Sequence, residues 1–130
     1  MTKPPLNHYK DHPILVTGGA GAIGTNLVLA LSQAGANPVI ILDDLSSSYQ
    51  WNIPNLSNVL FIKGDIRNDE VLKRVFRMHP RIVFHLAAFF ANQNSVDYPE
   101  TDILVSGLGT IKILEHAVLS KVERVVYAGS

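Results

Sequence analysis

Short runs of apolar residues alternate along this chain with stretches in which apolar residues recur every three or four positions. The runs are typical of strands buried on both faces, and five of them lie at residues 13–17, 38–42, 59–62, 82–86 and 125–127. The helical spacing predicts three helices: residues 22–34 with Gly35 as a stop, a segment from an N-cap at Asn68 to a stop before Pro80, and Leu104 to Val118. Strands that alternate with helices predict an α/β fold, with a parallel sheet, right-handed crossovers and helices on both faces.

The chain is expected to form one domain behind a short tail. Residues 1–12 are polar and contain Pro4 and Pro5, whereas residues 13–130 carry every predicted strand and helix. Within the domain, residues 45–58 are rich in Ser, Asn and Pro and contain the only tryptophan. This composition predicts a long surface connection of a kind that often touches ligand.

Composition and charge narrow the class of protein. Eleven Lys and Arg balance eleven Asp and Glu, so the chain has no net field to hold a nucleic acid against salt, and we expect no nucleic-acid partner. No apolar run approaches the roughly 18–20 residues of a membrane helix, and the polar start has no segment of signal-peptide type. We therefore expect a cytoplasmic protein without a membrane partner.

No metal site is expected. The chain has no cysteine, which excludes a thiolate zinc site, a disulfide framework and a cysteine nucleophile. His8 and His12 lie in the tail. The other histidines fall in separate predicted elements, without carboxylates at the spacing of metal ligands: His79, His85 and His116.

The segment between the first predicted strand and the first helix is rich in glycine and reads Thr17-Gly18-Gly19-Ala20-Gly21-Ala22-Ile23-Gly24. It fits G-x-G-x-x-G from Gly19 and G-x-x-G-x-x-G from Gly18. Glycines also make plain tight turns, and the glycines alone leave that alternative open. Between a strand and a helix, glycine lets the backbone approach a pyrophosphate, whose charge the helix N-terminus stabilises. Gly24 would let the helix pack close to the sheet.

Asp43 ends the second predicted strand, 19 residues after Gly24, close to the spacing of about 20 expected for an acid that binds the ribose of a dinucleotide. A carboxylate there can accept from both ribose hydroxyls and would repel a 2′-phosphate. No Arg or Lys lies between Pro38 and Ile62 to neutralise such a phosphate. The pattern therefore favours NAD over NADP. The alternative role for Asp43 is that of an acid that caps a loop.

With Gly64-Asp65-Ile66-Arg67, His85-Leu86-Ala87-Ala88 and Gly109-Thr110 added, the motifs resemble those of the extended short-chain dehydrogenase/reductases. Within that family the chain resembles the NAD-dependent epimerase/dehydratases of nucleotide sugars, such as UDP-glucose 4-epimerase, over nearly all of residues 13–130. The resemblance implies a Rossmann-like, doubly wound sheet of about five strands in the order 3-2-1-4-5, truncated after the fifth and lacking a C-terminal substrate domain. It also implies NAD as cofactor, and an oxidoreductase or isomerase reaction that passes a hydride between a sugar hydroxyl and NAD.

The same resemblance implies roles for individual residues around the adenosine half of NAD. Gly21, Ala22 and Ile23 would contact the pyrophosphate, with Gly18 and Gly24 in the same loop. The adenosine ribose would be held by Asp43 and its neighbours Asp44, Leu45, Ser46, Ser47 and Ser48. Asp65 and Ile66 would frame the adenine, although taken alone they read as an acid in a turn and a core isoleucine.

Around the nicotinamide half, the resemblance implies a lining of Leu86, Ala87 and Ala88, where Ala87-Ala88 alone reads as a tightly packed pair. Ser106 stands where the family usually has Asn, and it reaches less far toward a ribose hydroxyl. Phe89 and Phe90 would cover the nicotinamide or merely fill space.

The family resemblance implies a catalytic set that consists of a Ser or Thr, a Tyr and a Lys four residues after that Tyr. Ser130 matches the Ser/Thr position, and none of the four tyrosines is followed four residues later by Lys. We therefore expect the chain by itself to bind NAD(H) without turnover, with a nucleotide-sugar substrate only in a longer parent protein. The alternative is a freestanding, non-catalytic NAD-binding sensor or interaction module.

We also expect a homo-oligomer. The fifth predicted strand is apolar or aromatic at Val125, Val126 and Tyr127, and the chain ends at Ser130. An edge strand whose N–H and C=O groups lack a neighbour is a template for pairing with a second copy.

Overall fold

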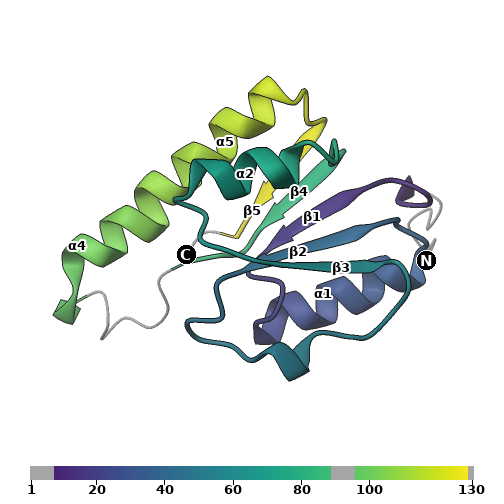
Figure 1. The fold of residues 1–130 in the computed structure, drawn as a ribbon, viewed down its shortest axis with the longest axis horizontal. Helices are drawn as coiled ribbons and strands as arrows, with labels where there is room; N and C mark the ends of the chain where they lie inside the picture. Colours follow the sequence, from purple (N-terminus) through teal and green to yellow (C-terminus); the bar gives the residue numbers. More distant parts are fainter. Residues whose placement is uncertain (1–7, 89–95, 129–130) are drawn as a thin grey trace, which may run out of the picture.

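A computed structural model describes residues 8–88 and 96–128. Its strands are β1 (Ile14–Thr17), β2 (Val39–Asp43), β3 (Val59–Lys63), β4 (Ile82–His85) and β5 (Arg124–Tyr127). They form one parallel sheet in the order β3-β2-β1-β4-β5 (Figure 1). The Rossmann-like order expected from the resemblance is confirmed.

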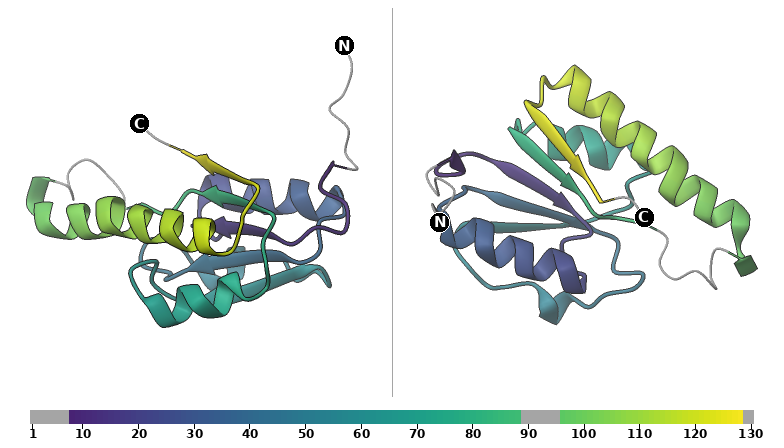
Figure 2. Two further views of the ribbon diagram at one scale, coloured as in Figure 1. Left: turned by 90° about the horizontal axis from the view of Figure 1, so that it is seen from above. Right: turned by 180° about the vertical axis from the view of Figure 1, so that it is seen from behind.

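The helices cover both faces of this sheet (Figure 2). On one face lies α1 (Ala22–Gln33), and on the other lie α2 (Asp69–Phe76) and α5 (Gly109–Leu119). Side chains alternate along each strand, so Leu15 and Ile40 join the core beneath α2 and α5. Their neighbours Ile14 and Val39 join the core beneath α1. Burial on both faces is the reason that these strands read as continuous apolar runs.

Local signals in the sequence end α1 and begin α2. Gly35 has a φ of +86°, and the N–H groups of Gly35 and Ala36 donate to the carbonyls of Ser32 and Leu31, which is the Schellman arrangement. The Asn68 side chain accepts from the N–H groups of Glu70 and Val71. The predicted helix stop and N-cap are both confirmed.

The end of α2 differs from the prediction. The helix ends at Phe76, before Pro80, because the next residues form a tight turn in which the N–H of His79 donates to the carbonyl of Phe76. His79 has a positive φ of 53°, which is incompatible with a continuing helix.

The helix predicted from Leu104 to Val118 is longer and is not uniform. It begins as α4 (Pro99–Asp102), widens into the π-helical segment η3 (Ile103–Leu108) and continues as α5. Pro99 occupies the first turn of α4, where proline is tolerated. Apolar periodicity does not report a π-helical turn, so the sequence predicted an ordinary helix here. Within the described residues, no helix has the length and apolarity to span a membrane.

Candidate functional site

The sequence-predicted residues gather where the strands end. In the sheet register Thr17 pairs with Leu42 on one side and with His85 on the other, so the loops after β1, β2 and β4 leave the sheet at one end. The strand order reverses between the neighbouring strands β1 and β4, and doubly wound sheets bind ligands at that switch point. The geometry places the glycine segment, Asp43 and Leu86–Ala88 around it.

Gly18 and Gly24 are needed by the protein's own packing. Gly18 has a φ of +71°, and a Cβ there would lie 2.9 Å from the backbone nitrogen of Ala87. A Cβ on Gly24 would lie 2.3 Å from the carbonyl oxygen of Gly18 and 2.7 Å from the Cα of Gly19. Gly24 therefore lets α1 approach the loop after β1, whereas the sequence analysis expected an approach to the sheet itself.

Gly21 has different surroundings. A Cβ there would meet only the carbonyl oxygen of Gly18, at an ordinary contact distance of 3.4 Å. Gly21 is the N-cap of α1, which has no side-chain cap and no acidic residue in its first turn. The positive end of the helix dipole is thus not neutralised by a carboxylate of its own first turn. An anion brought against the backbone at Gly21 fits this space, next to the exposed Ala22 and Ile23.

Asp43 is half-buried and ties two loops together. Its Oδ2 accepts from the N–H of Ala20 at 3.1 Å. Its Oδ1 accepts from the N–H of Leu45 at 2.8 Å and from the hydroxyl of Ser48 at 3.1 Å. The carboxylate thus caps its loop, which was the alternative considered from the sequence, and it holds that loop against the glycine segment.

The neighbours of Asp43 follow the surface. The Asp44 side chain accepts from the N–H of Ser46 at 3.0 Å, Ser46 and Ser47 are exposed, and Leu45 is half-buried with a positive φ of 63°. These residues form the rim of the predicted ribose site.

Asp65 is paired with a residue that the sequence analysis gave no role. The Arg67 Nη2 lies 2.5 Å from the Asp65 Oδ2, and the Arg67 Nε lies 3.0 Å from both carboxylate oxygens. The hydrogen bonds from Arg67 hold the pKa of Asp65 below its ordinary value. The Asp-x-Arg spacing was the signal that could have found this pair.

Ile66 faces the core. Only 5% of it is exposed, and a Cβ on Gly109 would lie 2.4 Å from its Cδ1. Gly109 therefore gives α5 room to pack over Ile66, and little of this side chain remains to cover an adenine ring.

The backbone of Leu86 and Ala87 is fastened to the end of β1 by the buried hydroxyl of Thr17. Both N–H groups donate to the Thr17 Oγ1 at 3.1 Å. Leu86 and Ala87 are half-buried and Ala88 is exposed. Sequence reasoning gave Thr17 no role beyond the first position of the glycine motif.

His85 is 1% exposed and contacts two hydroxyls. Its Nδ1 lies 2.6 Å from the Thr17 Oγ1 and its Nε2 lies 2.9 Å from the Thr110 Oγ1. Burial lowers the pKa of His85 to about 4, so the ring is neutral at neutral pH. The Thr110 hydroxyl donates in turn to the carbonyl of Ser106 at 2.6 Å, and the Ser106 hydroxyl donates to Asp102 at 3.1 Å.

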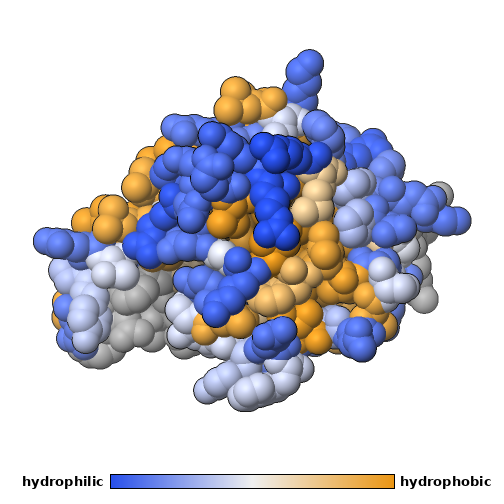
Figure 3. Space-filling model, in the orientation of Figure 1, coloured by the Kyte–Doolittle hydropathy of each residue, from blue (hydrophilic) through white to orange (hydrophobic). Residues whose placement is uncertain are grey.

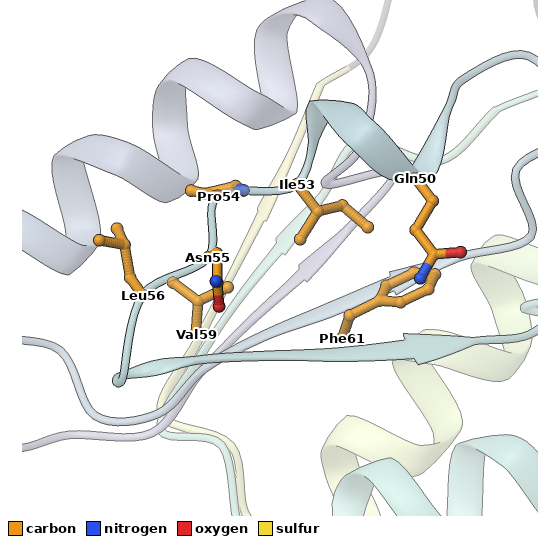
Figure 4. A pocket seen from close by; sticks show the side chains of 7 residues that line it. All are labelled: Gln50, Ile53, Pro54, Asn55, Leu56, Val59 and Phe61. Carbon is orange, nitrogen blue, oxygen red and sulfur yellow. The ribbon is translucent and has the colours of Figure 1, made fainter.

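The predicted surface connection, residues 45–58, makes a separate hollow against β3. Its lining side chains come from the connection and from the strand (Figure 4): Gln50, Ile53, Pro54, Asn55, Leu56, Val59 and Phe61. None of the predicted site residues lines it. The connection reaches the glycine segment through Asn52 of the 3₁₀ turn η2 (Gln50–Asn52), whose side chain donates to the carbonyl of Ala20 at 3.4 Å.

Three residues that the sequence singled out lie outside the residues that the structure describes. Ser130, Phe89 and Phe90 fall outside residues 8–88 and 96–128. Across those described ranges, no three His, Asp or Glu side chains come together as a set that could hold a metal ion.

Comparisons with known proteins agree on one family. The model of the NAD dependent epimerase/dehydratase family matches residues 14–130. A UDP-glucose 4-epimerase of Mycolicibacterium smegmatis is 39% identical over 119 residues, covering 89% of this chain and 38% of that protein. A CDP-paratose 2-epimerase of Salmonella typhi is 37% identical over 109 residues, covering 78% of this chain and 31% of that protein.

Solved structures extend the comparison to the fold. An epimerase of Methanothermobacter thermautotrophicus has a TM-score of 0.95 and 62% identity, covering 97% of this chain and 37% of that one. A Bordetella bronchiseptica enzyme in complex with NAD+ has a TM-score of 0.87 and 33% identity, covering 95% of this chain and 37% of that one. The matched residues thus span 31–38% of the length of these relatives.

Proposed function

Because the chain belongs to the NAD-dependent epimerase/dehydratase family, we propose that these residues are the NAD-binding portion of a nucleotide-sugar epimerase or dehydratase, similar to UDP-glucose 4-epimerase. The observation that carries the proposal is the surroundings of Gly21. A glycine that no protein contact requires stands at the uncapped start of α1, close to the loop that Asp43 holds in place. This arrangement fits a dinucleotide pyrophosphate followed by a ribose.

Each part of NAD has candidate residues. Gly21, Ala22 and Ile23 would hold the pyrophosphate, and Asp43 with residues 44–48 would hold the adenosine ribose. Asp65 and Ile66 would lie at the adenine. Since Arg67 already donates to both oxygens of Asp65, an adenine amino group would share that carboxylate with Arg67. Residues 86–88 and Ser106 would lie on the nicotinamide side.

When bound, NAD supplies a hydride acceptor for a sugar hydroxyl. The chain's own residues bind and orient the cofactor, and Ser130 is the proposed hydroxyl of the catalytic set. No Tyr-x-x-x-Lys occurs in these 130 residues, so we expect NAD binding without conversion of UDP-glucose. Measurable conversion by the pure chain would show that the catalytic group is elsewhere.

Charge around Asp43 favours NAD over NADP. Asp43 and Asp44 stand side by side, and the nearby Arg67 is held by Asp65. Lys63 pairs with Asp43 in the sheet register. It directly follows residues 38–62, which contain no Arg or Lys. A 2′-phosphate would still meet more carboxylates than free cations here.

The test is calorimetric titration of the chain with NAD+ and with NADP+. We expect tighter binding of NAD+, and we expect Asp43→Ala to weaken NAD+ binding about tenfold or more and to narrow the preference, because a charged hydrogen bond is worth about 1.5–3 kcal/mol. Glu115→Ala is the control, since it removes one negative charge from an exposed position on α5 that has no role in the proposed site. Tighter binding of NADP+ by the unaltered chain would refute the assignment.

A freestanding NAD-binding module remains the alternative. It is distinguished by reading the coding region downstream of Ser130. A Tyr-x-x-x-Lys motif there makes these residues part of an epimerase or dehydratase, and a stop codon there favours the module.

A further inference from the structure

Three side chains from different elements form a hydrogen-bonded chain that the proposed function leaves without a role. Thr17 ends β1, His85 ends β4 and Thr110 lies in the first turn of α5. We infer that His85 is a positioning residue, whose ring, fixed with its proton on Nε2, links the glycine loop to the helix that carries Ser106. The inference rests on the proposed function, because Ser106 is the residue proposed to reach a ribose of NAD.

The position of the ring proton follows from Thr110. A hydroxyl has one proton, and that of Thr110 is directed to the carbonyl of Ser106, 2.6 Å away. A carbonyl only accepts, so the Thr110 oxygen has no proton left for the imidazole. It therefore accepts from the His85 Nε2 at 2.9 Å, and Nε2 carries the proton.

The other ring nitrogen then determines the orientation of Thr17. A neutral ring protonated on Nε2 has a lone pair on Nδ1, so the Thr17 hydroxyl donates to Nδ1 across 2.6 Å. The two lone pairs of Thr17 remain for the N–H groups of Leu86 and Ala87, each at 3.1 Å. The Leu86 N–H is shared, because it also donates to the backbone carbonyl of Thr17 at 3.1 Å.

A proton on Nδ1 would break this arrangement. It would leave Nε2 without a proton, 2.9 Å from a Thr110 hydroxyl whose own proton is directed to the carbonyl of Ser106. Two acceptors would then face each other in a place where His85 is almost completely buried. The lowered pKa of the ring agrees with this. One tautomer is thus compatible with all of the contacts.

The consequence is a rigid connection across the proposed cofactor site. Thr17 begins the glycine loop and holds Leu86 and Ala87, while Thr110 holds the backbone of the π-helical segment η3 at Ser106. The ring spans the distance between them. Loss of either hydroxyl contact would break this link between the glycine loop and η3, so Ser106 would be held less well for a ribose.

The test uses the 130-residue chain, ¹⁵N-labelled in its histidine side chains, with Thr110→Val and Thr110→Ser variants. Without NAD+, we expect the Nδ1 and Nε2 resonances of His85 to be far apart in the unaltered chain, as in a single Nε2–H tautomer. Thr110→Val keeps the side-chain shape and removes the acceptor, so the two resonances should move toward each other. Thr110→Ser keeps the hydroxyl and should retain the separation.

NAD+ affinity is measured on the same proteins by calorimetry. We expect Thr110→Val to bind NAD+ about tenfold more weakly, which corresponds to about 1.4 kcal/mol, and Thr110→Ser to stay close to the unaltered chain. Thermal unfolding identifies a variant that fails to fold. His85→Gln is a second variant, because it keeps a donor near the position of Nε2 and lacks the Nδ1 acceptor. We expect it also to bind NAD+ more weakly.

The outcomes separate the inference from the proposed function. A proton on Nδ1, mixed tautomers in the unaltered chain, or full NAD+ affinity in both Thr110→Val and His85→Gln would overturn the inference. An unaltered chain with a single Nε2–H tautomer that does not bind NAD+ would overturn the proposed function, and with it the role of His85 in placing Ser106.

Discussion

Gly21 and Gly24 lie three residues apart in the same segment, yet they have opposite surroundings. Backbone atoms of the loop fill the space where a side chain on Gly24 would lie, whereas a Cβ on Gly21 would make only an ordinary contact with the carbonyl oxygen of Gly18. Packing explains Gly24 without any ligand. Gly21 is the N-cap of α1, where glycine is favoured over alanine, and its surroundings also fit the proposed approach of a pyrophosphate to the backbone.

Alanine substitutions separate these two roles. We expect Gly24→Ala to lower the free energy of unfolding by about 1–3 kcal/mol, because the added methyl group overlaps backbone that cannot move easily. Gly21→Ala should lower it less, by about 0.5–1 kcal/mol, because glycine is a better N-cap residue than alanine, and should weaken NAD+ binding by at least about tenfold. Urea unfolding followed by circular dichroism measures the first effect, and calorimetry the second. Equal losses of stability in the two variants would contradict the assignment.

Among the elements, α1 and α2 begin in contrasting ways. The first turn of α2 is completed by the protein itself, through the Asn68 cap and the acidic residues Asp69 and Glu70. Asp69 also accepts from Lys112 at 2.7 Å, which ties α2 to α5. The start of α1 has neither a side-chain cap nor an acidic residue. Both helices pack on the core, and the difference fits the proposed binding of an anion at the start of α1.

The cap of α2 has a measurable effect. We expect Asn68→Ala to lower the free energy of unfolding by about 1 kcal/mol, because the N–H groups of Glu70 and Val71 lose their acceptor. Asn26→Ala is the matched control, since the Asn26 side chain is exposed and donates within α1. The control should stay within about 0.5 kcal/mol of the unaltered chain. Similar losses in both variants, measured by urea unfolding, would mean that the cap contributes nothing specific.

The whole molecule has an apolar side that the described residues do not cover. Figure 3 shows apolar side chains along the edge of the molecule where α5 lies. Exposed apolar residues of α5 and β5 contribute to this side: Ile111, Leu114, Val118, Leu119, Val126 and Tyr127. Within the described part of the chain, β5 is the last strand of the sheet on this side. In the 130-residue chain by itself, both features favour association with a second copy.

Self-association at this edge is the expected behaviour of the chain in solution. Light scattering at micromolar concentration should show a dimer or a larger species, and Val126→Lys should shift it toward the monomer, because a charge on β5 opposes strand pairing. Leu60→Lys is the control on the opposite edge, where Leu60 of β3 has the same exposed fraction as Val126, 40%. A monomer in the unaltered chain would refute the prediction, and a dimer sensitive only to Leu60→Lys would place the contact on β3.

Local patterns were sufficient for much of the fold. The buried strands, the start of α2 and the end of α1 at Gly35 were each predicted from neighbouring residues, because strand burial, capping and positive φ depend on residues a few positions apart. The glycine segment and Asp43 were recognised for the same reason, and the strand order followed from the resemblance of their motifs to a family. The turn at His79 and the π-helical widening at η3 were missed, because neither changes the apolar periodicity.

What the sequence alone determined about this protein is therefore its elements and the short motifs between them. Only the tertiary structure decided which glycine is free of packing and that His85 joins Thr17 to Thr110. These three residues are far apart in the chain and meet because β1 and β4 pair in one register while α5 packs across them. A hydrogen bond between distant residues depends on that packing, and a pattern read along the chain contains only the spacing of neighbours.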